Sequence, residues 1–71
     1  MTEEIRAEIV ANVWKVAARE GEAMHKGDTV VILESMKMEI PVLTGSDGKL
    51  TRLAVTEGDV VQEGDLIAVV D

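Results

Sequence analysis

Apolar and polar residues alternate in short stretches along this chain, and glycine-containing turns separate the stretches. Residues 5–11 begin with a clear alternation, whereas residues 29–33 form a continuous, mostly β-branched run. Alternation is typical of a strand with one buried face, and a continuous β-branched run is typical of a strand buried on both faces. Residues 1–4 show neither pattern, so we expect a frayed end there. Short strands between glycine turns predict an all-β fold.

The sequence repeats itself with an offset of 37 residues. The offset aligns residues 20–22, 26–28 and 29–34 with residues 57–59, 63–65 and 66–71. Two copies of one supersecondary unit predict an approximate twofold axis, with each half covering the apolar face of the other. We therefore expect a single domain over residues 1–71, built from repeats of about 5–34 and 42–71. The symmetry predicts that the two chain ends meet at one end of the domain.

Residues 12–19 are ambiguous between helix and strand. Their apolar residues come in the pairs Val13-Trp14 and Val16-Ala17, a spacing that fits a helix nearly as well as a strand. The equivalent residues 49–56 alternate better and are richer in strand formers. We therefore predict strands for both stretches, with Trp14 packed in the core beneath the sheet.

The joint between the two repeats carries the most unusual sequence, a lysine between two methionines. Met36-Lys37-Met38 lies opposite the chain ends under the predicted symmetry, so Lys37 is expected at the tip of an exposed hairpin. Two-residue hairpin turns prefer Asn-Gly or Asp-Gly, because both central residues usually need a positive φ. A turn made against this preference suggests a functional site. The alternative is one long strand over residues 29–43 with a solvated lysine in its middle.

Composition and charge restrict the classes of function. The 71 residues are 46% apolar and 30% charged, which suits one small globular domain. The chain has no cysteine, and this excludes disulfides, thiolate metal sites and cysteine nucleophiles. A net charge of −7, without Phe or Tyr, argues against nucleic-acid binding. No apolar run is long enough to span a membrane, and the acidic start is unlike a signal peptide, so we expect a cytoplasmic protein.

The remaining polar residues do not form a catalytic set. His25 has no serine or cysteine arranged beside it, and we expect it on the surface. Asp28, Asp59 and Asp65 recur at turns, where capping of the backbone is a better explanation than metal binding. The apolar side chains are small, which argues against a deep ligand pocket. We therefore predict that the chain is not an enzyme and binds no metal.

The motif at the joint resembles the attachment motif of the biotin carboxyl carrier family, including its small stand-alone bacterial members. The resemblance covers the octet at residues 34–41 and the glycine turns of both repeats. It implies a flattened barrel-sandwich of two four-stranded antiparallel sheets with quasi-twofold symmetry and no protruding thumb. It also implies covalent biotin on Lys37 and three partners: biotin protein ligase, biotin carboxylase and carboxyltransferase. The motif residues that a ligase would recognise are Glu34, Ser35, Met36, Met38 and Glu39.

The chain departs from the family pattern at residues 8–11. Glu8-Ile9-Val10-Ala11 stands where many members have Pro-Met-Pro-Gly, which affects the first turn and its docking surface rather than the attachment site. Two other functions are consistent with this fold. Lipoyl carriers also present a lysine on a hairpin, but usually without flanking methionines, and an unmodified β module could act as an adaptor. We expect the chain to be a monomer when it is isolated.

Overall fold

A computed structural model describes residues 2–71 of the chain. They form eight strands, and no helix that could cross a membrane occurs among them. The strands are β1 (Glu3–Arg6), β2 (Ala11–Val16), β3 (Ala23–Met24), β4 (Thr29–Ser35), β5 (Met38–Leu43), β6 (Gly48–Leu53), β7 (Val60–Val61) and β8 (Leu66–Val70). The long strands are rich in Val, Ile and Leu, which pack well on a pleated surface.

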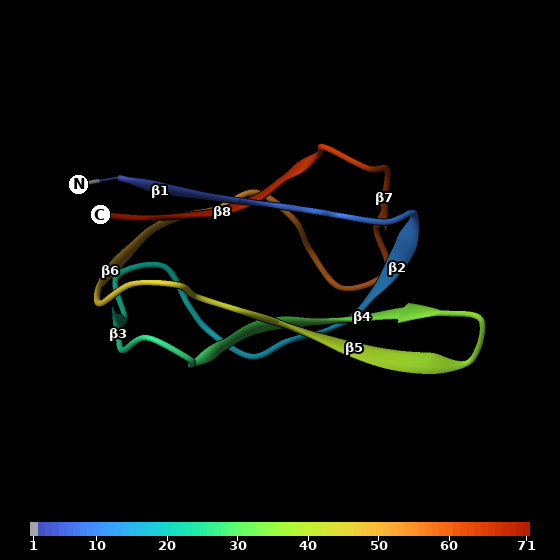
Figure 1. The fold of residues 1–71 in the computed structure, drawn as a ribbon, viewed down its shortest axis with the longest axis horizontal. Helices are drawn as coiled ribbons and strands as arrows, with labels where there is room; N and C mark the ends of the chain where they lie inside the picture. The colour runs from blue at the N-terminus through green and yellow to red at the C-terminus, as the bar shows by residue number, and fades with distance from the viewer. Residues whose placement is uncertain (1) are drawn as a thin grey trace.

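The strands form two four-stranded antiparallel sheets that pack face to face (Figure 1). One sheet has the order β1-β8-β6-β3 and the other β5-β4-β2-β7. An offset of 37 residues carries each strand of the first sheet onto the strand at the same place in the second, and it matches the bounds of β2 with those of β6. The predicted all-β, quasi-twofold class is therefore confirmed. Residues 2–71 contain no inserted thumb between the strands.

The symmetry extends to the contacts that join the two repeats. The carboxylate of Glu57 accepts a hydrogen bond from the backbone N–H of Val16 at 3.0 Å, and that of Glu20 accepts one from Leu53 at 2.8 Å. Each turn glutamate therefore satisfies a backbone donor of the other repeat. Four turn glycines hold positive φ values between 91° and 94°, a conformation that glycine adopts without steric cost. They are Gly21, Gly27, Gly58 and Gly64.

One small core lies between the sheets. Its largest fully buried side chains include Leu33, Leu50 and Ile67, and no buried side-chain polar atom of the described residues lacks a hydrogen-bond partner. Long-range strand pairing and this shared core mean that neither repeat can bury its apolar face alone.

Two sequence-based expectations were wrong. Trp14 is 48% exposed rather than buried, because it follows the buried Val13 and so lies on the same outer face as the exposed Asn12. The register of β2 against β4 then shifts between Val13 and Lys15, and this β-bulge interrupts the alternation of faces after Trp14, which explains the ambiguous apolar spacing. Glu3 and Glu4 belong to β1 and pair with β8, so they are not frayed, and Met1 lies outside the described residues.

Candidate functional site

The β4–β5 hairpin ends in a two-residue turn formed by Met36 and Lys37. Ser35 and Met38 are paired across the turn, and Met36 and Lys37 have φ values of 54° and 64°. No other non-glycine residue in residues 2–71 has a positive φ. This conformation costs a side-chain-bearing residue roughly 1–2 kcal/mol. The hairpin predicted from the repeat therefore exists, and it is made against local preference.

The ladder between β4 and β5 stabilises this strained turn. Paired residues continue from Ser35 and Met38 back to Thr29 and Leu43, with one irregularity beyond Val31. Unfavourable local conformations persist only where the surrounding structure determines them, and they concentrate at functional sites. Two rigid strands thus impose on Met36 and Lys37 a conformation that their side chains do not favour.

The tip of the hairpin is highly exposed. Met36 is 91% exposed and Met38 is 64% exposed, and Lys37 between them is also exposed. Met38 therefore contributes little to packing the hairpin against the sheet edge. Figure 1 shows the turn between β4 and β5 at one end of the long axis and the ends of β1 and β8 at the other. The predicted separation of Lys37 from the chain ends is confirmed.

The Lys37 ammonium group makes no ion pair or hydrogen bond within the described part of the chain. The ion pair found there joins Arg6 to Glu4, and the Nδ1 of His25 lies 3.8 Å from a carboxylate oxygen of Asp28. An enclosing enzyme could therefore take the lysine without breaking an internal contact. The other lysines are exposed but lie elsewhere: Lys15 on β2, Lys49 on β6 and Lys26 in a glycine turn.

Two carboxylates flank the hairpin on its strands. Glu34 and Glu39 are directly opposite each other in the ladder, and Glu34 faces Asn12 on its other side. Like charges directly opposite in a ladder are destabilising, and no ion pair in residues 2–71 offsets this one. The structure therefore brings together the six predicted motif residues: Glu34, Ser35, Met36, Lys37, Met38 and Glu39.

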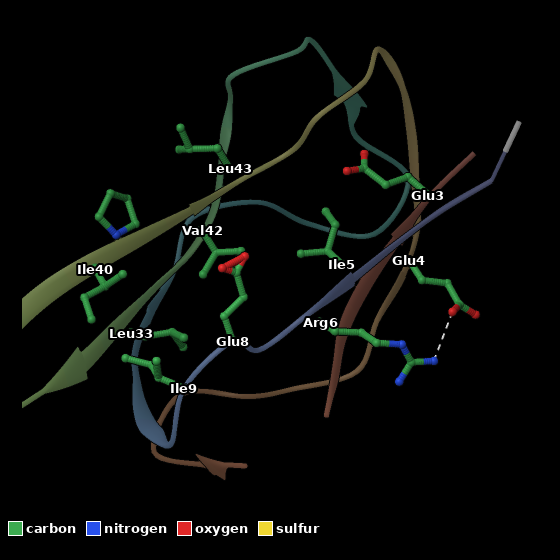
Figure 2. A pocket seen from close by; sticks show the side chains of 11 residues that line it. Glu3, Glu4, Ile5, Arg6, Glu8, Ile9, Leu33, Ile40, Val42 and Leu43 are labelled. Carbon is green, nitrogen blue, oxygen red and sulfur yellow. Dashed lines mark hydrogen bonds and ion pairs between the residues drawn. The ribbon is translucent and has the colours of Figure 1, made fainter. Parts of the chain in front are cut away.

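A groove of about 460 Å³ separates β1 from β5 (Figure 2). Its floor is apolar and includes Ile5, Leu33 and Val42, and its rim carries Glu4 in an ion pair with Arg6. Symmetry-related segments of the two repeats form its two walls. Among the described residues that line the groove, no nucleophile is paired with a base and no three side chains could hold a metal ion.

The turn aspartates cap the backbone as predicted. Asp28, Asp59 and Asp65 each accept a hydrogen bond from the N–H three residues earlier, at 2.9, 2.9 and 2.8 Å. No group of three acidic or histidine side chains in residues 2–71 could hold a metal ion. His25 is on the surface, 3.8 Å from Asp28.

One structural residue escaped sequence analysis. The carboxylate of Glu3 accepts hydrogen bonds from the Gly45 N–H, the Ser46 hydroxyl and the Thr44 hydroxyl, at distances between 2.8 and 3.2 Å. A Cβ at Gly45 would lie 2.8 Å from this carboxylate, so glycine permits the close approach. The symmetry mate of Glu3 is Ile40, which is why the repeat gave no signal for this contact.

Comparison with known proteins identifies the family. A model of the family described as "Biotin-requiring enzyme" matches residues 4–70. The chain belongs to the biotin/lipoyl attachment family. Membership of this family agrees with the prediction of a carrier domain that is not itself an enzyme.

Three similar proteins illustrate the range of the family. A biotinylated protein TB7.3 homolog of Mycobacterium leprae is 57% identical over 70 residues, or 99% of each chain. A biotin/lipoyl attachment protein of Bacillus subtilis is 41% identical over 63 residues, covering 89% of this domain and 86% of that protein. The crystal structure of Kluyveromyces lactis urea carboxylase matches with 35% identity and a TM-score of 0.93, over 100% of this domain and 6% of that chain.

Proposed function

We propose that this chain is a biotin carboxyl carrier, with biotin in amide linkage to the Nζ of Lys37. The strained Met36-Lys37 turn at an exposed hairpin tip is the observation that carries the proposal. A local cost of this kind is retained where the resulting geometry serves a function. The chain is similar to a biotinylated protein over nearly its full length and to a segment of a urea carboxylase. Both similarities support biotin as the attached group.

The residues at the tip fit the attachment reaction. The Lys37 amine, once deprotonated in a ligase active site, attacks the acyl carbon of biotinyl-adenylate. An amide bond forms, AMP leaves, and the positive charge of the lysine is lost from a chain whose net charge is −7. Met36 and Met38 offer flexible, polarisable contacts to the enzyme that encloses the lysine.

The rest of the domain provides a rigid support for a mobile arm. Bound biotin would supply a ureido group that accepts carboxylate from a biotin carboxylase and delivers it to a carboxyltransferase. The two sheets hold the base of the arm in a fixed position, and the exposed turn leaves the lysine side chain free to move between two active sites. The protein therefore contributes placement and reach, while the partner enzymes contribute catalysis.

The test is the intact mass of the protein after incubation with biotin protein ligase, biotin and ATP, beside a parallel reaction with a lipoate ligase and lipoate. One biotinyl increment, and no lipoyl increment, is the expected result. A lipoyl increment alone would reassign the chain as a lipoyl carrier. A mass unchanged by either ligase would favour the unmodified adaptor.

A further inference from the structure

Because the fold is duplicated, the surface of one sheet can be compared with the surface of the other. An offset of 37 residues gives each side chain of one sheet a counterpart in equivalent surroundings in the other, including the two bulges at Val13/Lys15 and Leu50/Arg52. A surface residue that both repeats need for the shared fold should therefore have a similar residue at the equivalent position, and Glu3 differs from its mate because only one repeat makes its contact. A systematic difference between the two surfaces needs another cause.

The exposed apolar residues differ in this systematic way. Within residues 2–71, every exposed large apolar side chain lies on the hairpin-bearing sheet, at its tip or in the loop that enters it. Away from the tip, each has a polar or small counterpart on the other sheet. The pairs are Ile9 with Ser46, Val10 with Asp47, Trp14 with Thr51, Leu43 with Arg6 and Val60 with Ala23. The other repeat adopts the same fold with polar or small residues at these positions, so folding does not require the apolar side chains.

Two of these residues lie on the outer face of the hairpin-bearing sheet, opposite the core. Val60 on β7 is 61% exposed and pairs with Asn12, which in turn pairs with Glu34 on β4. Trp14 projects from the bulge that follows Val13, next to that row. Figure 1 shows β7 and the β4–β5 turn at the same end of the molecule. We call the surface formed by Trp14 and Val60 the outer patch.

The charges beside the outer patch differ between the repeats in the same way. The row through Asn12 continues across the sheet from Glu34 to Glu39, two like charges without an internal partner. Their counterparts are Asp71 and Thr2, which satisfy each other through a 2.9 Å hydrogen bond. The acidic pair beside the hairpin is therefore complementary to a cationic side chain from outside the domain.

We propose that biotin protein ligase docks on the outer patch while Lys37 enters its active site. This inference rests on the proposed function. The reacting Nζ stands only one lysine side chain away from the hairpin backbone, so an enzyme acting on it must press against the flanks of the hairpin. A carboxylase acts at the end of the much longer biotinylated arm and has no such requirement. The patch is continuous with the hairpin through the Glu34–Glu39 row and contains a tryptophan, a residue type that often dominates binding energy.

The test uses steady-state biotinylation of the unmodified domain by the ligase of the same organism. Trp14→Thr and Val60→Ala give each position the residue of its symmetry mate, and the double variant combines them. Leu43→Thr is the matched control, because it removes a 50% exposed apolar side chain that lines the groove instead of the outer patch. Circular dichroism melts confirm that all variants are folded.

The double variant should raise the KM for the domain about tenfold or more while kcat stays nearly constant, as expected for lost docking contacts. Leu43→Thr should leave both constants unchanged. An unchanged KM in the double variant, or an equal rise in the control, would overturn the proposal. So would a double variant that impairs use of the biotinylated domain by a carboxylase but not biotinylation itself. If the ligase does not biotinylate the parent protein at all, the proposed function is refuted together with this inference. That outcome is distinguishable from a failure of the inference alone, because it is seen without any variant.

Discussion

The two repeats share their interior and differ on their surface. Leu33 and Leu50 are fully buried, one from each repeat, and the turn glutamates Glu20 and Glu57 make equivalent hydrogen bonds. On the outside, one sheet exposes Trp14 and Val60, whereas the other exposes polar or small residues at the equivalent positions. The shared fold therefore does not account for the apolar surface of the hairpin-bearing sheet, whereas the asymmetric Glu3 serves an internal contact.

The hairpin tip is the strongest asymmetry. It joins the two repeats, and an offset of 37 residues places the counterparts of Met36 and Lys37 outside the residues that the structure describes. The strain, the exposed methionines and the unpaired carboxylates all gather at this end of the domain. The opposite end, in contrast, has its loop held by Glu3.

The largest expected effect tests whether the two repeats contribute to one shared core. Leu33→Ala and Leu50→Ala each remove a buried side chain and leave a cavity, so each should lower the free energy of unfolding by about 2–5 kcal/mol. The two losses should be similar, as measured by urea denaturation at equilibrium. If only one of the two variants lost stability, the two repeats would not contribute to one shared core.

The next effect concerns the end of the domain opposite the hairpin. Glu3→Ala removes the acceptor for the 44–46 loop and should cost about 1–3 kcal/mol of stability, because backbone and hydroxyl donors lose their partner. Glu4→Ala, in an exposed ion pair with Arg6, is the control and should cost about 0–1 kcal/mol. Equal costs for the two variants would mean that Glu3 does not hold the loop.

A smaller effect of opposite sign is expected at the tip. Met36→Asn places in the left-handed region a residue that tolerates it, and should raise the free energy of unfolding by up to about 1 kcal/mol. Met38→Asn, in the strand, should give no gain, since asparagine is disfavoured in strands. Chemical denaturation of both variants separates these outcomes, and a destabilised Met36→Asn protein would show that the turn is not strained.

The smallest effect tests the exposure of Trp14, the single tryptophan of the chain. Because its side chain is 48% exposed, acrylamide should quench its fluorescence strongly in the folded protein, with a modest further increase on unfolding. Quenching that appears only on unfolding would show that Trp14 is buried in the folded protein and that the outer patch does not exist.

The repeat made much of this structure predictable from sequence. It correctly indicated strands where the apolar spacing of residues 12–19 was ambiguous, and it located the hairpin that turn rules alone would have missed. It could not show the bulge beside Trp14, because a bulge changes which face a residue occupies without changing the pattern of residue types. The contact between Glu3 and the 44–46 loop was also beyond reach, since it joins residues more than forty positions apart and has no symmetric copy.

Site-resolved mass spectrometry tests the central claim, that the asymmetric hairpin carries the modification. After biotinylation, peptides covering Lys15, Lys26, Lys37 and Lys49 are compared between the parent protein and Lys37→Arg. We expect the whole biotinyl increment on the Lys37 peptide, and no increment anywhere in the variant. Biotin on another lysine of the parent, or biotin retained by Lys37→Arg, would contradict the account.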